Sequence, residues 1–217
     1  MSSGIGREGR RGARPGPGTI AVACAAAALG ASIAIAVGHA LADVPLEQWR
    51  LSARYTARFS FPILLVTFVA SSWHRLAPSA ASRFVLLRRR ALGLAFATAH
   101  TIHLGALVTV NVLAGEVPKP VTLIAGGGAY LVMFAMVLTS NDAAVRRLGR
   151  NWVRLHKLGI YWLWFVFTFS YGGRAFGDKP EFLPFFLLLV AGLGLRIAAA
   201  RVKRGGRTAV LVSSQQA

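Results

Sequence analysis

The chain has little negative charge and almost no cysteine. Of its 217 residues, seven are Asp or Glu, and Cys24 is the one cysteine. A single cysteine cannot form an intrachain disulfide, and it cannot supply the thiolate set of a zinc site or an iron–sulfur cluster. Redox chemistry in this chain therefore requires a bound cofactor.

Charged residues of either sign are also scarce, at 15% of the chain, while hydrophobic residues make up 55% and the mean hydropathy is +0.54. This composition is too apolar for a water-soluble domain and predicts an all-α integral membrane protein. The net charge of +18 does not indicate nucleic-acid binding, because the basic residues lie between apolar runs and not on one face of a soluble domain.

Six apolar runs are long enough to span a bilayer as helices. The first exceeds the length of a signal-peptide core, which favours a retained helix. We expect a basic, disordered tail over residues 1–18, a six-helix transmembrane domain over residues 19–200 and a cytoplasmic tail over residues 201–217. The predicted helices cover residues 19–42, 55–74, 91–114, 121–139, 152–172 and 181–200.

Most of the 25 lysines and arginines fall on one side of this six-span arrangement. They lie in the N-terminal tail, in residues 75–90 and 146–157, and after the last span. Because positive charge collects on the cytoplasmic side, both termini are predicted to be cytoplasmic. The expected location is the inner (plasma) membrane, with multiple passes through the lipid bilayer.

Three histidines lie inside the predicted spans. His100 and His103 are in the third span and His156 is just inside the fifth. Intramembrane ionisable groups usually face the bundle interior and serve a function, although one such histidine alone is equally consistent with a helix–helix hydrogen bond. His39 and His74 lie near span ends, where an imidazole meets water or headgroups.

Histidines on separate helices of a bundle suit haem, whose iron takes two axial imidazoles. Zinc is less suitable because the spans offer no carboxylate or thiolate to complete a tetrahedral set. At 1.5 Å rise per residue, His103 lies about 20 Å beyond Arg90, while His156 lies only about 8 Å beyond Asn151. Depth therefore favours His100 as the partner of His156, and helix tilt would allow His103.

Two segments resemble a known family. They are RRALGLAFATAHTIHL at residues 89–104 and LTSNDAAVRRLGRNWVRLHKLGIYWLW at residues 138–164. Both are similar to the third and fifth helices of the ferric-reductase-like transmembrane domain. More narrowly, they resemble the haem-binding membrane subunit of the bacterial periplasmic methionine sulfoxide reductase system. Tyr55 to Arg58 and Lys119-Pro120 are further matches, and the resemblance covers residues 50–172.

The resemblance implies a six-helix bundle that holds b-type haem and passes electrons across the membrane. His103 matches the family's third-helix histidine and His156 matches the first histidine of the fifth helix. The family's second fifth-helix histidine falls at Phe169 in this chain. Three interpretations follow: one haem between His156 and His100 or His103, a haem at His103 with a different partner or none, or a bundle without haem.

Three arginines are further candidates for cofactor binding. Arg58 either neutralises a haem propionate or extends to the membrane surface. Arg150 and Arg154, with Arg146 and Arg147, either hold haem propionates, a flavin (FMN) phosphate or a quinone head, or simply mark the cytoplasmic side.

Residues 201–217 contain no GxGxxG motif and are too few for a dinucleotide-binding domain. We therefore expect a separate electron donor, either a quinol or a flavin reductase, and a periplasmic or extracellular acceptor. The resemblance implies a molybdenum-containing periplasmic sulfoxide reductase as that acceptor. The sequence thus predicts a b-haem electron-transfer subunit, and the alternative is a haemless bundle that acts as a scaffold or carrier.

Overall fold

The computed structural model describes residues 16–215, of which 204–215 are described by their backbone alone. The regular secondary structure in this part of the chain is helical, as predicted, and short turns connect the helices. The elements are α1 (Pro17–Ala40), α2 (Pro45–Leu76), α3 (Ala80–Leu87), α4 (Arg89–Ala114), α5 (Pro120–Thr122), a π-helical turn (Leu123–Gly127), α6 (Gly128–Leu138), α7 (Asp142–Leu148), α8 (Arg150–Ala175), a 3₁₀ turn (Pro180–Phe182) and α9 (Leu183–Gln215).

Five of these helical segments are long and apolar enough to cross a membrane: α1, α2, α4, the segment Pro120–Leu138, and α9 up to Lys203. The predicted fifth span, α8, is long enough but is less apolar. Its first eight residues include Arg150, Arg154 and Lys157, and its middle is rich in Trp and Tyr. These aromatic side chains favour the membrane interface as much as the hydrocarbon. The composition of α8 alone therefore does not identify a span.

Several helices extend beyond the predicted spans. The second helix begins at Pro45 and not at residue 55, because Pro45 occupies the first turn and Glu47 follows it, both favourable at a helix start. The stretch expected to be a basic loop contains α3, which Ser79 and Ser82 start with a reciprocal capping box. The last helix continues to Gln215, past the expected end at residue 200. The predicted disorder of residues 1–18 falls almost wholly outside the described residues.

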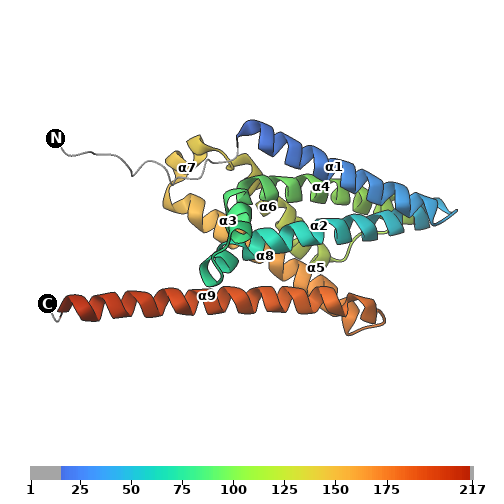
Figure 1. Cartoon of the computed structure of the whole chain (residues 1–217). Coiled ribbons are helices and arrows are strands. Elements are labelled where there is room, and N and C mark those ends of the chain that lie inside the picture. The colour runs from blue at the N-terminus through green and yellow to red at the C-terminus, as the bar shows by residue number, and fades with distance from the viewer. Residues whose placement is uncertain (1–15, 216–217) are drawn as a thin grey trace.

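The long helices run lengthwise along the bundle (Figure 1). Among them, α2 contacts α1, α4, α8 and α9. The start of α1 and the end of α9 lie at the same end of the bundle. Large apolar side chains from five helices meet around α2 to form the main core. They include Phe61, Leu64 and Phe68 of α2, Phe96 of α4, Met133 of α6, Leu163 and Phe167 of α8, and Leu189 of α9.

Small residues bring α1 close to α2 and α4. Ala27 and Ala31 of α1 pack against Ala95 and Ala99 of α4. A Cβ atom added at Gly38 would lie 2.5 Å from the backbone nitrogen of Ser52, so α1 and α2 touch at that point through their backbones. Small residues allow helices in a membrane to approach in this way.

The run Gly126 to Gly128 does not bring two helices close together. A Cβ at Gly126 or Gly127 would meet no atom within 4 Å, and one at Gly128 would make only an ordinary contact with Trp162. The glycines instead belong to, or directly follow, the π-helical turn. The Trp162 indole donates a hydrogen bond to the Ala125 carbonyl of that turn, at 3.2 Å.

Candidate functional site in the histidine bundle

Three hydroxyl side chains on one face of α2 each contact a histidine of another helix. Ser52, Thr56 and Ser60 recur every fourth residue, which places them along one stripe of the helix. All three are fully buried. Their oxygens lie 3.1, 3.0 and 3.2 Å from the Nδ1 atoms of His39, His103 and His100, in that order. We call Ser52, Thr56 and Ser60 the hydroxyl ladder.

The other hydrogen bonds of the ladder favour one tautomer in each of the two α4 histidines. Thr56 donates its own proton to the Ser52 carbonyl at 2.7 Å, and Ser60 donates to the Ala57 carbonyl at 3.1 Å. Each hydroxyl therefore accepts a proton from the imidazole, which places the ring hydrogens of His103 and His100 on Nδ1. The Nε2 atoms then carry the lone pairs, which is the state of a neutral metal-ligating imidazole.

Aromatic rings surround the α4 pair. The His100 and His103 ring centroids are 4.9 Å apart, and His100 is stacked at 5.0 Å from Phe96 and at 5.1 Å from Tyr130. Phe167 of α8 lies 5.2 Å from His100. Both histidines are 8% exposed, so the pair lies in an apolar interior lined by π faces.

His156 lies in a different environment, at the junction between α6 and α8. Its Nε2 donates to the Thr139 hydroxyl at 3.1 Å, because that hydroxyl gives its own proton to the Ala135 carbonyl. Its ring stacks on Trp152 at 4.1 Å, and the Trp152 indole donates to the Thr139 carbonyl. These contacts attach the start of α8 to the end of α6.

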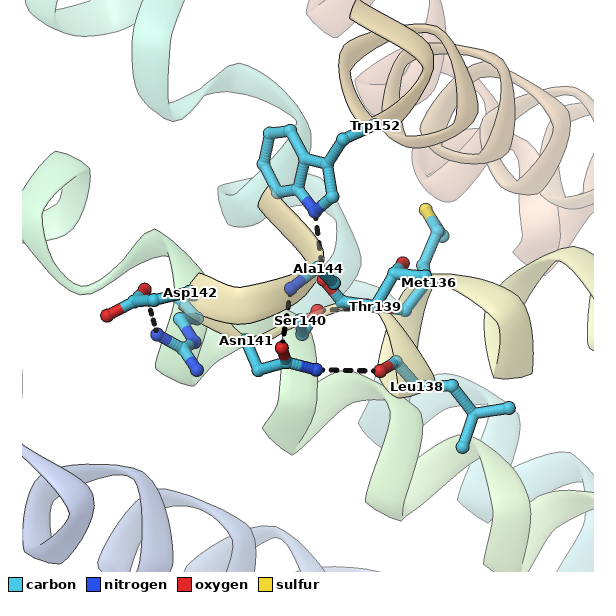
Figure 2. Close-up of polar contacts among 9 residues, drawn as sticks. Met136, Leu138, Thr139, Ser140, Asn141, Asp142, Ala144 and Trp152 are labelled. Carbon is cyan, nitrogen blue, oxygen red and sulfur yellow. Dashed lines mark hydrogen bonds and ion pairs between the residues drawn. The ribbon is translucent and has the colours of Figure 1, made fainter. Parts of the chain in front are cut away.

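The rest of the junction is built from side-chain caps. Figure 2 shows the Asn141 side chain between Leu138 and Ala144, where its oxygen accepts from the Ala144 amide at 2.8 Å and its nitrogen donates to the Leu138 carbonyl. This cap starts α7, and Asp142 beside it pairs with Arg90 at 3.3 Å. We call residues 138–156 with these contacts the junction.

Of the three predicted iron ligands, the structure brings His100 and His103 together and leaves His156 apart. Among the described residues, no hydrogen bond or ring contact joins His156 to either α4 histidine, and no group of three His, Cys, Asp or Glu side chains is placed to hold a bare metal ion. Phe169, where the resemblance places a family histidine, is 65% exposed and lies on the surface of the bundle.

The predicted arginines lie at opposite ends of α8. Arg150 and Arg154 are exposed in its first turns, where Arg154 donates to Asn151 at 3.3 Å. Arg58, on α2, is partly buried near the other end, with its guanidinium carbon 5.0 Å from the centre of the Phe182 ring. These arginines do not form one cluster.

Sequence reasoning missed the hydroxyl ladder. The spacing of Ser52, Thr56 and Ser60 on one helical face could have indicated it. The predicted span began at residue 55 and therefore did not include Ser52. A buried hydroxyl stripe in a membrane helix is a typical means of binding polar side chains of neighbouring helices.

The fold and the site together define a multi-pass helical membrane protein with a buried pair of imidazoles whose Nδ1 atoms contact hydroxyl groups of α2. The chain is 32% identical over 165 residues to the protein-methionine-sulfoxide reductase heme-binding subunit MsrQ of Salmonella enteritidis. That alignment covers 69% of this chain and 74% of the relative.

Two further relatives carry the same name. MsrQ of Cronobacter sakazakii is 31% identical over 127 residues, covering 52% of this chain and 62% of the relative. MsrQ of Xanthomonas axonopodis pv. citri is 31% identical over 109 residues, covering 48% and 49%. These alignments span about half to three-fifths of the relatives' lengths. No family model and no solved structure matches the chain.

The chain belongs to the MsrQ family of haem-binding subunits. The residues of the bundle fit a haem in two respects. An imidazole held through Nδ1 presents Nε2 as a ligand, and the aromatic side chains provide the apolar surroundings that a porphyrin needs. His156 fits less well, since Thr139 engages its Nε2.

Proposed function

We propose that this protein is a membrane bundle of six spans, with α8 as the fifth span along the chain, and that it acts as a b-type haem-binding electron-transfer subunit. The observation that carries the proposal is the His103–Thr56 hydrogen bond through Nδ1, which would leave the His103 Nε2 to hold the haem iron. When bound, the haem iron supplies a one-electron redox centre inside the membrane.

His103 is the principal ligand in this proposal. His100 lies one turn earlier on α4 with the same tautomer, and it is the alternative donor from that helix. His156 would hold the iron only if its Nε2 gave up the bond to Thr139. The surrounding rings of Phe96, Tyr130 and Phe167 exclude water from the α4 pair.

The bundle lies in the inner membrane with its termini in the cytoplasm, an orientation that the distribution of basic residues supports. Electrons enter from a quinol or a flavin reductase on the cytoplasmic side, where Arg150 and Arg154 are exposed for a quinone head or an FMN phosphate. They leave to a periplasmic acceptor, and the relatives' names, which refer to protein-methionine-sulfoxide reductase, support a reductase of that kind.

The test is a reduced-minus-oxidised absorption spectrum of the detergent-purified chain, with haem quantified after expression in ample haem. We expect a sharp b-type α-band and about one haem per chain. A flat spectrum would overturn the proposal.

The second candidate function is a haemless bundle that serves as a scaffold or carrier. Phe169 favours it, because a phenyl ring replaces a family ligand, and Phe167 already fills the space beside His100. A flat spectrum together with an intact, folded bundle would establish this alternative.

A further inference from the structure

Two arginines from different helices meet one buried aromatic ring where α8 ends and α9 begins. The Arg58 guanidinium carbon is 5.0 Å from the centre of the Phe182 ring, and that of Arg174 is 5.4 Å from the same centre. Phe182 is 2% exposed. We call Arg58 and Arg174 the arginine pair.

The arginine pair has no acidic partner in the described part of the chain. The ion pairs found there join Arg50 to Glu47 and Arg90 to Asp142. Asp178 and Glu181 lie in the connection next to Phe182, yet neither forms an ion pair with Arg58 or Arg174 in residues 16–203. Two like charges at one ring repel each other, and an anion placed between them would relieve that repulsion.

Arg58 also has an unsatisfied donor. Its Nε is buried and has no hydrogen-bond partner, although α2 is one of the helices apolar enough to span the membrane. Arg174 is exposed and donates to Ser170 at 3.1 Å, so the pair has one buried member and one member open to solvent. A buried N–H without a partner is rare in native structures and commonly marks a missing ligand or ion.

The pair is next to the histidine site. Thr56, Ala57 and Arg58 are consecutive residues of α2, and they contact in turn His103, the Tyr171 hydroxyl and the Phe182 ring. Because Thr56 and Arg58 are two residues apart on α2, a ligand held by Arg58 lies within one helical turn of the residue that contacts His103. Guanidinium groups bind carboxylates and phosphates with charge-assisted, often bidentate, hydrogen bonds.

We propose that Arg58 and Arg174 bind the carboxylate or phosphate group of an amphipathic ligand whose apolar body enters the bundle. Two sources carry this chemistry: a propionate of the haem, a source that rests on the function proposed above, and the headgroup of an anionic lipid. The arginine pair would then neutralise the ligand, and the ligand would satisfy the Arg58 Nε.

The experiment compares the variant Arg58→Gln/Arg174→Gln with a control, Arg50→Gln/Lys179→Gln, which removes the same charge from exposed positions of the same segments. Each protein is titrated with haem b and with its dimethyl ester, in which both carboxylates are blocked. If a propionate is the ligand, the arginine variant binds haem b at least about tenfold more weakly than the control, and the two bind the ester equally.

Native mass spectrometry with phosphatidylglycerol or phosphatidylcholine tests the lipid source. If the arginine variant loses bound phosphatidylglycerol and the control keeps it, the ligand is the headgroup of an anionic lipid. Both measurements are repeated with the single variant Arg174→Gln. Arg174 is exposed, so this substitution should leave the fold intact. The proposal is overturned if neither the haem titration nor the lipid retention separates the arginine variants from the control. The lipid measurement stands even if the chain binds no haem, so the failure of one proposal is distinguishable from the failure of the other.

Discussion

The α4 histidines and His156 use hydroxyl partners in opposite ways. On α4, His103 and His100 donate from Nδ1 to the hydroxyl ladder, which leaves Nε2 free in a buried, aromatic interior. At the junction, His156 donates from Nε2 to Thr139 while it remains half-buried. The difference teaches that the role of an intramembrane histidine can be inferred only together with its hydrogen-bond partner. The arrangement on α4 suits a metal ligand, whereas the arrangement at the junction attaches one helix to its neighbour.

The largest effect that separates the two regions should come from removing the histidines. We expect His103→Ala to weaken haem binding by more than about 100-fold, since losing a ligand costs more than the roughly 10–100-fold lost with a partner of a ligand. His156→Ala should weaken it less. Haem per chain and the α-band of each purified variant measure this, with the interfacial His74→Ala as control. If His156→Ala empties the protein while His103→Ala does not, α8 supplies the principal ligand and our comparison is reversed.

A smaller effect should follow from changing the ladder hydroxyl. Thr56→Val keeps the shape of the side chain but offers His103 no acceptor, so haem affinity should fall by about 10–100-fold. Thr56→Ser keeps the hydroxyl and should restore most of that affinity. Equal affinities for the valine and serine variants in a haem titration would show that the hydroxyl does not position His103.

Packing around the two regions should differ as well. A Cβ at Gly38 would meet the Ser52 backbone at 2.5 Å, whereas one at Gly159 would meet Met136 and Val132 side chains, of which Met136 is flexible. We expect Gly38→Ala to destabilise the bundle by about 1–3 kcal/mol and Gly159→Ala to cost less. Thermal unfolding in detergent measures both, and Gly194→Ala, which has open space, is the control. A larger loss for Gly159→Ala would contradict the expected order.

The smallest effect should come from one hydrogen bond of the junction. Trp152→Phe keeps a ring to stack on His156 but removes the indole donor to the Thr139 carbonyl, 2.9 Å away. The expected loss is about 1 kcal/mol in the free energy of unfolding, with haem content unchanged. A clear drop in haem content would mean that the junction takes part in binding the cofactor.

Much of the fold was predictable because apolar length is a local property. The ranges of the third and fourth predicted spans agree closely with α4 and with Pro120–Leu138. Helix ends were less predictable: the start at Pro45 and the helix beginning after Ser79 depend on caps within polar sequence, which a search for apolar runs treats as loops. The six-span count and the side on which the termini lie remain predictions.

The candidate site was predictable in part. The presence of His100 and His103 within one span already indicated that both could lie on neighbouring turns of one helix. The expected partnership of either with His156 rested on depth alone, and depth does not say which way a ring points. In the structure, Thr139 and Trp152 hold that ring at the junction.

By itself, the sequence determined that this protein is a helical membrane protein with histidines inside apolar spans. Hydropathy and helical rise are local properties, so both follow from the order of the residues. Only the tertiary structure decided which nitrogen of each histidine is free, since Thr56 and His103 are 47 residues apart and meet through the packing of α2 against α4. It also decided that Arg58 and Arg174 share the Phe182 ring. Contacts between helices depend on how each is rotated against its neighbours, and that rotation is set by the packing of the whole bundle.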